Sequence, residues 1–237
     1  MTGERIETIR AAEAYSHTEA YRNLRLFEPG SWLAKPVRTV MELIPHFSDC
    51  SDFQGLDLGC GIGRNCIPVL QELSHVPSRM DCVDILPLAV EKLMENGKKY
   101  GVADRINGIV CPADHYSIRE NGYNLILGLS VLEHLESTEI LEQKLLEIWA
   151  GLRPGGIACF VINTSVEEHD KKSGKSLDVQ FEINLSADAM EILLDRTFSE
   201  AEILKKTQIH YQYDTYRESG TVRLDTDVLT YVARKRN

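Results

Sequence analysis

The sequence predicts an α/β fold, a doubly wound and mostly parallel sheet, from three observations. Short apolar runs alternate with helical patterns from residue 55 to about residue 164. A glycine-rich turn joins the first apolar run directly to a helix. The run at 123–129 is almost continuously apolar, as expected of a strand covered on both faces. Such alternation implies right-handed crossovers and parallel strands.

The expected elements alternate along this part of the chain. The first strand ends at Asp57, and further strands are expected at 80–84, 106–111, 123–129 and 157–162. Helices are expected at 66–73, from Pro87 to Gly101, and at 137–152. The proline suits the first turn of its helix, and the glycine suits the residue that ends it.

The pattern changes after residue 165. Residues 166–176 are rich in charge and predict a mobile loop. Ser186 is expected to cap a helix whose core face is Met190, Leu193 and Leu194. Two long strands, 203–216 and 221–235, are expected to form a hairpin near Gly220. Residues 1–50 are largely helical by pattern, and we interpret them as a cap on the domain formed by residues 51–237.

The glycine turn favours one kind of nucleotide ligand over another. Its glycines stand at alternate positions, Gly59, Gly61 and Gly63, with Asp57 two residues ahead. A dinucleotide fingerprint needs its third glycine at the sixth position, for close helix packing, and here that residue is Arg64. An NAD-linked oxidoreductase is therefore disfavoured. The free N–H groups at the start of the next helix still suit a nucleotide-like ligand.

Several motifs together resemble class I S-adenosylmethionine-dependent methyltransferases over about residues 55–165. They are the glycine turn behind Asp57, Asp84, Ala113-Asp114, Leu132-Glu-His-Leu135 and Leu152-Arg-Pro-Gly-Gly156. The most similar subgroup is the broad small-molecule type found in ubiquinone biosynthesis and tellurite resistance. The resemblance implies a Rossmann-like methyltransferase fold with a seven-stranded sheet, whose last strand is inserted antiparallel.

The resemblance also implies that S-adenosylmethionine lies beyond the carboxyl ends of the strands, where open α/β sheets bind ligands. Asp84 is expected to accept from the ribose hydroxyls, Ile85 to pack on the adenine, and Asp114 to accept from its amino group. The expected cofactor-binding residues are Asp57, Gly59, Cys60, Gly61, Gly63, Asn65, Asp84, Ile85, Ala113, Asp114, Leu129 and Ser130. Three acids suit a cationic cofactor better than an anionic pyrophosphate.

Four other residues are weaker candidates. His134 lies beside the position expected for the methyl group and is a candidate catalytic base. Tyr21 and Trp32 are candidates for a substrate contact or a lid over the cofactor. Glu133 is ambiguous. Simpler interpretations stay open, since Asp57 can cap the turn, Asp114 can be a loop acid, and His134, Tyr21 and Trp32 can be structural.

The function expected is methyl transfer to a small-molecule acceptor by in-line displacement, with S-adenosyl-L-homocysteine as the product. Catalysis of this reaction rests mainly on proximity and orientation. The alternative is a non-catalytic sensor or partner subunit that binds S-adenosylmethionine. Residues 129–132 read Leu-Ser-Val-Leu rather than Asn-Pro-Pro-Tyr, so nucleobase and glutamine methylation are disfavoured. The sequence does not identify the acceptor atom.

The composition limits which partners and which cellular compartment are expected. The 237 residues carry a net charge of −10, which disfavours nucleic acid as a partner. The six cysteines form no Cys-x-x-Cys pair and no cluster at metal-ligand spacing, so no metal is expected. The N-terminus is charged, and the longest apolar stretch, 125–132, is too short to cross a bilayer. We expect a cytoplasmic monomer or homodimer without a membrane partner.

Overall fold

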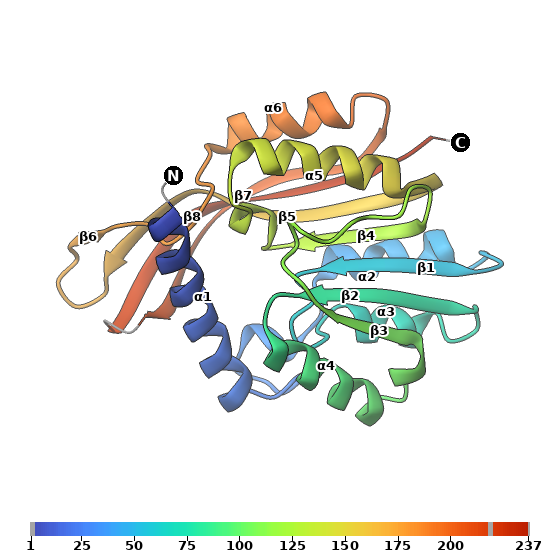
Figure 1. Cartoon of the computed structure of the whole chain (residues 1–237), viewed down its shortest axis with the longest axis horizontal. Coiled ribbons are helices and arrows are strands. Elements are labelled where there is room, and N and C mark those ends of the chain that lie inside the picture. The colour runs from blue at the N-terminus through green and yellow to red at the C-terminus, as the bar shows by residue number, and fades with distance from the viewer. Residues whose placement is uncertain (1–2, 218–219, 237) are drawn as a thin grey trace.

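The computed structural model describes residues 3–217 and 220–236, which form one sheet covered by helices (Figure 1). Within these residues the sheet has eight strands, seven of them in the order β3-β2-β1-β4-β5-β8-β7. The parallel strands are β1 (Phe53–Leu58), β2 (Ser78–Asp84), β3 (Ile106–Val110), β4 (Tyr123–Leu129) and β5 (Leu152–Asp170). The predicted doubly wound, mostly parallel sheet is confirmed.

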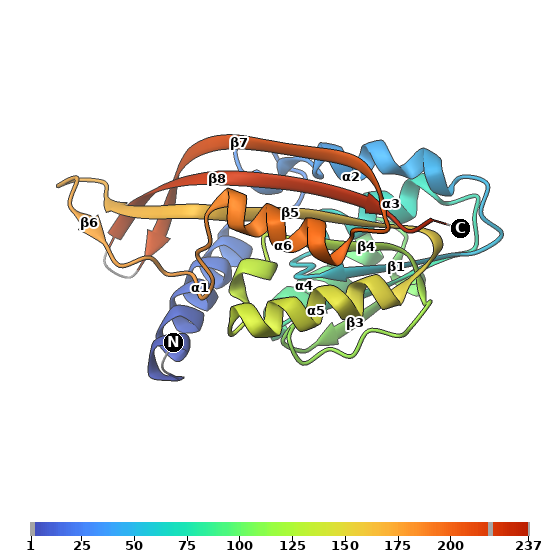
Figure 2. The ribbon, with the colours of Figure 1, turned by 90° about the horizontal axis from the view of Figure 1, so that it is seen from above.

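The C-terminal hairpin is also confirmed. Strand β8 (Gly220–Arg234) lies antiparallel between β5 and β7 (Glu202–Arg217). The outer parts of these three strands, together with β6 (Ser176–Leu177), project beyond the parallel strands (Figure 2). We call this projection, residues 164–170, 176–177, 211–217 and 220–227, the outer arm.

Two predictions for this region were wrong. Residues 166–170 are not a loop, because β5 continues to Asp170 and pairs with β8. Val166 and Glu168 are both buried there, and Glu168 pairs with Arg217, so part of the charge in this stretch is buried rather than solvated. The sheet also has the additional short strand β6, which pairs with β5 where seven strands were expected.

The helices cover both faces of the sheet. The helices are α1 (Gly3–Asn23), α2 (Arg38–Leu43), α3 (Cys66–Glu72), α4 (Pro87–Lys99), α5 (Thr138–Gly151) and α6 (Ala187–Thr197). Short 3-10 turns are η1 (Trp32–Ala34), η2 (Ile44–Phe47), η3 (Ala103–Arg105) and η4 (Leu132–His134). Helices α5 and α6 lie on one face, and α2 and α3 on the other (Figure 2). Ser186 caps α6 as predicted, by accepting from the Ala189 N–H.

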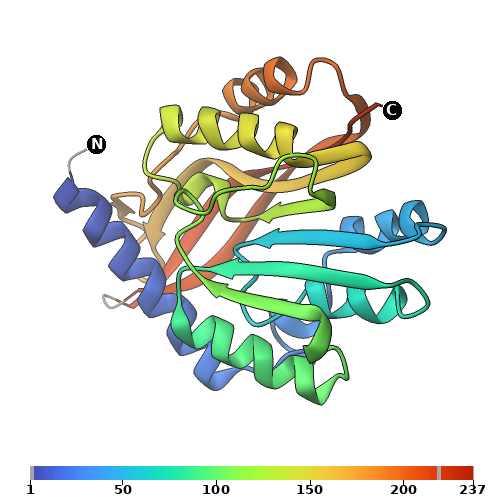
Figure 3. The same ribbon diagram turned by 45° about the vertical axis from the view of Figure 1, so that its right-hand side comes forward.

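The N-terminal segment packs onto the sheet. Tyr21, Leu33 and Phe47 belong to the same buried cluster as Leu70 and Leu125 of the α/β core. Helix α1 runs along the carboxyl ends of the parallel strands (Figure 3). This edge is where the predicted site residues lie, so α1 contributes side chains to it. Among the helices of the described residues, none combines the length and apolar content needed to cross a bilayer.

Candidate functional site

The glycine turn between β1 and α3 is held tightly against its neighbours. The Gly59 and Cys60 N–H groups both donate to the Val83 carbonyl oxygen, at 2.8 and 3.0 Å. Gly63 has a φ of +97°, and a Cβ there would lie 2.6 Å from the Ile67 Cδ1 atom. Only glycine fits this conformation and this close approach. The position of Gly63, which distinguishes this turn from a dinucleotide fingerprint, therefore follows from its close packing against α3.

Asp84 lies at the end of β2 and connects the turn to the next loop. Its Oδ2 accepts from the Gly61 N–H at 2.8 Å, and its Oδ1 accepts from the Leu86 N–H at 2.9 Å. Burial raises the pKa of Asp84, and these two hydrogen bonds oppose that rise. Each carboxylate oxygen keeps a further lone pair, so Asp84 can also accept from a ligand. Ile85 beside it is half-exposed and available for an apolar contact.

Asp57 lies at the end of β1 and is buried without full hydrogen bonding. The residue is 1% exposed, and its Oδ2 has no hydrogen-bond partner among the residues that the structure describes. Burial and the nearby charge of Asp84 raise the pKa of Asp57 to about 8, although a hydrogen bond with the Cys66 backbone opposes this. A buried carboxylate oxygen without a partner is costly unless a donor or a cation reaches it. The turn thus fits a ligand with a positively charged group.

Asp114 follows β3 and forms an ion pair with a residue of α1. Its carboxylate is 4% exposed and accepts from the Arg10 guanidinium at 2.9 Å. The same guanidinium lies 3.4 Å from Glu136. Ligand atoms of Asp114, His115 and Glu136 lie within 4.8 Å of one another, but Arg10 already compensates two of these groups, so we assign them no metal. Ala113 beside Asp114 is half-buried.

The segment after β4 contains a buried polar group. Leu129 is half-buried, and Ser130 is exposed with a φ of +53°. The buried Glu133 accepts through Oε1 from the Asn163 backbone N–H at 2.9 Å and from its side-chain amide at 2.6 Å. The Glu133 Oε2 has no hydrogen-bond partner within residues 3–217 and 220–236. Burial raises the pKa of Glu133, and the charge of His134 and the contacts with Asn163 oppose that rise.

The contacts of His134 favour its protonated form. Its Nδ1 lies 3.0 Å from Glu182 Oε2, and its ring stacks on Phe181. Burial alone would lower the pKa of His134, but the hydrogen bond with Glu182 and the charges of Glu13 and Glu133 raise it to about 9. A protonated imidazole has no lone pair with which to accept a proton. This environment favours a charge-stabilising role for His134 over the predicted role of a base.

Helix α1 and the segment after it cover the glycine turn. The Tyr21 Oη lies 2.7 Å from where a Cβ on Gly61 would be. Tyr21 also contacts the half-exposed ring of Trp32, which lies next to the His17 ring and the Arg64 guanidinium as well. Asn65 accepts from the Val37 N–H at 2.9 Å and so ties the N-terminal segment to the turn. The Cys60 thiol is buried beneath the turn, and burial raises its pKa to about 12.

Sequence reasoning missed the charged groups that α1 brings to this edge. Glu13 pairs with Arg217 of β7, which also lies 2.9 Å from Glu168. Arg10, Glu13, His17 and Tyr21 are spaced three or four residues apart. This spacing places them on one helix face, so periodicity alone could have grouped them. The residues that they contact, on the outer arm and in the loop before α6, lie far away in the sequence. No local sequence pattern predicts these contacts.

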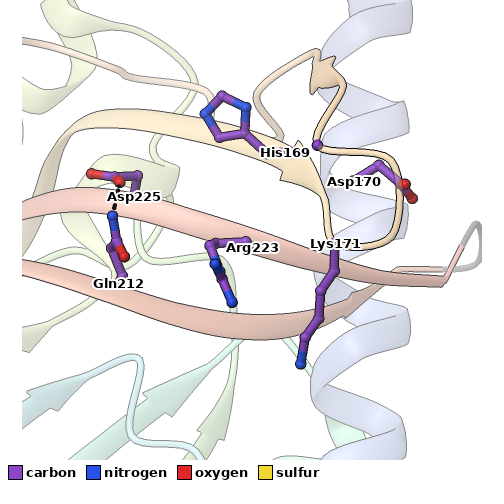
Figure 4. A pocket seen from close by; sticks show the side chains of 7 residues that line it. His169, Asp170, Lys171, Gln212, Arg223 and Asp225 are labelled. Carbon is purple, nitrogen blue, oxygen red and sulfur yellow. Dashed lines mark hydrogen bonds between the residues drawn. The ribbon is translucent and has the colours of Figure 1, made fainter.

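Two pockets lie near the outer arm. One, of about 530 Å³, is lined by Thr8, Ala11, Ala12, Tyr15, Glu168, Leu177, Asp178, Gln180 and Arg217. It therefore lies between α1 and the arm, beside the pair formed by Arg217 and Glu13. The other, of about 260 Å³, is lined mainly by polar and charged residues of β5, the loop after it, β7 and β8 (Figure 4). Its side chains pair with each other or with close neighbours, as in the Gln212–Asp225 and Lys171–Asp214 contacts, so we do not consider it further.

Known proteins share this sequence pattern and this fold. A family model described as a methyltransferase domain matches residues 56–156. The ubiquinone biosynthesis O-methyltransferase of Rickettsia canadensis is 26% identical over 119 residues, which are 50% of this chain and 46% of that protein. The corresponding protein of Rickettsia felis is 24% identical over 119 residues. The chain thus spans about half the length of these relatives.

Solved structures extend the similarity to most of the chain. TehB from Haemophilus influenzae superposes with a TM-score of 0.60 at 19% identity, covering 83% of this chain and 62% of that one. The [4+2]-cyclase SpnF superposes with a TM-score of 0.63 at 15% identity, covering 96% of each chain. The strand order and the glycine turn thus define a Rossmann-like methyltransferase fold. Residues 56–156 thus match a methyltransferase domain, and the fold around them is that of class I S-adenosylmethionine-dependent methyltransferases.

Proposed function

We propose that this chain transfers a methyl group from S-adenosylmethionine to a small-molecule acceptor by in-line displacement. The observation that carries the proposal is Asp84, whose carboxylate is fixed by the Gly61 N–H at the carboxyl edge of the sheet. The strand order reverses between β1 and β4, and ligands of open α/β sheets bind at this switch point. The net charge of −10 supports a small molecule rather than nucleic acid as the acceptor.

The residues at this edge suit S-adenosylmethionine, which when bound supplies a methyl group activated by a cationic sulphur. Asp84 would accept from the ribose hydroxyls, and Ile85 would cover the adenine. The unpartnered oxygen of the buried Asp57 would face the positive charge of the cofactor. Asp114 would reach the adenine amino group only if Arg10 shared it or moved away, because the two are now paired.

The acceptor would approach through the pocket between α1 and the outer arm. Its wall is largely small or apolar, with Ala11, Ala12, Tyr15 and Leu177, and its charged side is the Arg217–Glu168 pair. Since the contacts of His134 favour its protonated form, we infer an acceptor whose nucleophile needs no proton removal by that residue. The N-terminal cap, part of the same domain, would orient the acceptor and exclude water, which is the main task of an enzyme whose cofactor is already activated.

Calorimetry with S-adenosylmethionine tests the cofactor site. The Asp84→Ala variant removes the acceptor for the ribose hydroxyls, and hydrogen bonds to a charged group contribute about 1.5–3 kcal/mol each. Binding should therefore weaken by about 100-fold or more. Asp104→Ala, at an exposed carboxylate in η3, is the matched control and should leave the affinity unchanged. Undiminished binding by Asp84→Ala would remove Asp84 from its proposed role.

A second candidate is a protein that binds S-adenosylmethionine without transferring its methyl group. The raised pKa of His134 supports it, because a protonated imidazole beside the expected methyl position has no lone pair with which to act as a base. The likeness to a [4+2]-cyclase supports it too, since it shows that this fold is not confined to methyl transfer. Incubation of a metabolite extract with a labelled methyl donor separates the two functions. Label transfer supports the enzyme, and cofactor binding without transfer supports the alternative.

A further inference from the structure

Strand β7 presents a long open edge to solvent. It is the last strand in the sheet order, and among residues 3–217 and 220–236 no strand pairs with its outer side. Its nine consecutive residues from Lys206 to Asp214 are all exposed. The pairing with β8 is regular from Lys205 to Arg217, so the outer backbone N–H and C=O groups form a continuous row that no other described strand pairs with. Such a row is a template for another strand.

This edge carries charged residues but lacks two other features that prevent pairing, a proline and a bulge near its centre. No proline occurs within residues 202–217, and the only register shift along β7 lies at Ile203/Lys205, near its start. Three large side chains instead stand out from its centre, Ile209, Tyr211 and Tyr213, which are 51%, 49% and 41% exposed. An apolar stripe on an open edge is typical of an interaction surface.

The contacts of the chain fix which side chains of β7 share a face. Thr215 contacts Ser16 of α1, so the residues in phase with it, Tyr213, Tyr211 and Ile209, share the face toward the N-terminal helices. Lys206 contacts Asp195 of α6, and its face also carries His210 and Asp214. One face of the edge is therefore apolar and aromatic, and the other is charged.

We propose that β7 pairs antiparallel with β7 of a second copy of this chain, about a two-fold axis at His210. Lys206 then lies opposite Asp214 of the second copy, and Ile209 lies opposite Tyr211. Gln208 meets Gln212, and Thr207 meets Tyr213. Each pair occurs twice, as in every interface between identical surfaces. Opposite charges and aromatic–aliphatic pairs are the cross-strand contacts that stabilise a sheet.

Neighbouring registers are less complementary. An axis at Ile209 places Asp214 opposite Leu204 and leaves Lys206 opposite Gln212. An axis at Tyr211 places Lys205 opposite Arg217, two like charges. The register at His210 alone among these three matches opposite charges. Within the chain, Lys206 and Asp214 already contact Asp195 and Lys171, so the new pairs would extend existing charge networks.

Disulfide cross-linking tests the register. His210→Cys places two cysteines directly opposite each other, with Cα atoms about 4.5–5.5 Å apart, which is within disulfide range. Gln208→Cys is the matched control, because its copies would lie four residues apart along the strand, about 14 Å, too far to bridge. We expect a disulfide-linked dimer under mild oxidation from His210→Cys and not from Gln208→Cys. The unmodified protein measures the background from its native thiols.

Sedimentation measures the association itself. Ile209→Lys should give a monomer, whereas Ile192→Lys, at an isoleucine 69% exposed on α6, should stay dimeric. Lys206→Asp should also dissociate the dimer, and Lys206→Asp with Asp214→Lys should restore it by exchanging the paired charges. Circular dichroism checks that each variant is folded. A monomeric unmodified protein overturns the proposal, and so does a dimer that resists Ile209→Lys and gives no His210→Cys cross-link.

Discussion

Replacement of Gly61 by alanine tests how closely α1 covers the glycine turn. Gly61 has a φ of +52°, and a Cβ at this position would lie 2.7 Å from the Tyr21 Oη. The left-handed conformation costs a residue with a side chain about 1–2 kcal/mol. Overpacking against a buried neighbour adds about 1–3 kcal/mol. We therefore expect Gly61→Ala to lower the free energy of unfolding by about 2–5 kcal/mol.

Two further variants separate the backbone cost from the contact. Gly101 has a φ of +73°, and a Cβ at this position would have no other atom within 4 Å, so Gly101→Ala should show the backbone cost alone. Tyr21→Phe removes the Oη atom, and the nearest remaining atom, Cζ, lies 3.5 Å from the Cβ position on Gly61, an ordinary contact. Gly61→Ala should thus be tolerated better in a Tyr21→Phe background.

The assay is a double-mutant cycle measured by urea unfolding of the four proteins. We expect a coupling energy of about 1–3 kcal/mol between Gly61→Ala and Tyr21→Phe, because the second change relieves the clash created by the first. Effects that add within about 0.5 kcal/mol would refute the placement of Tyr21 over the turn.

Three other predictions concern buried charges. The pKa of His134 rises from 6.5 to about 9 on folding, so its contribution should be complete below pH 6.5 and disappear as the pH rises through 9. We expect the unmodified protein to lose at most about 3 kcal/mol of its free energy of unfolding across this pH range. His134→Gln should not show this loss when its unfolding is measured over the same range. The pKa of Asp57 rises from 3.8 to about 8, which favours its protonated form, so ionisation should cost stability progressively between those values. At pH 8, Asp57→Asn should therefore unfold at a higher urea concentration than the unmodified protein. The variant should also bind S-adenosylmethionine more weakly. Equal stability of the two proteins would contradict a buried charge at Asp57. Arg217→Met leaves Glu13 and Glu168 without their shared partner and should cost about 3–5 kcal/mol in urea unfolding. Arg223→Met, at an exposed arginine on β8, is its control and should cost under about 1 kcal/mol.

The parts of the fold that the sequence predicted are those with local signals. The glycine turn needs positive φ values within a few residues, and the Ser186 cap acts on an N–H three residues away. The strands at 123–129 and 203–216 were visible as apolar or alternating runs. The position of Asp84 followed from one strand and one rule about where parallel strands end.

The parts that were missed depend on residues far apart in the sequence. The charge of Glu168 and its neighbours predicts a loop, yet Arg217 lies 2.9 Å from Glu168 across the sheet. Asp114 was assigned to the cofactor without knowledge of Arg10, which approaches it from α1. The sequence predicts His134 as a candidate base, but Glu182, from the loop before α6, lies beside it and favours its protonated form. Ion pairs of this kind depend on tertiary packing, and the periodicity of the sequence does not predict them.

The buried thiols give this protein a built-in reporter of local opening. Cys60, Cys66, Cys82 and Cys159 are buried, whereas Cys50 and Cys111 are partly exposed. The thiolate is the form that reacts with thiol reagents, and burial raises the pKa of Cys60 and Cys159 to about 12. Two fast and four slow labelling phases should result. The slow labelling rate at Cys60 would then measure how often the glycine turn opens locally. A ligand that stabilises the closed turn would slow this labelling, and no engineered probe would be needed.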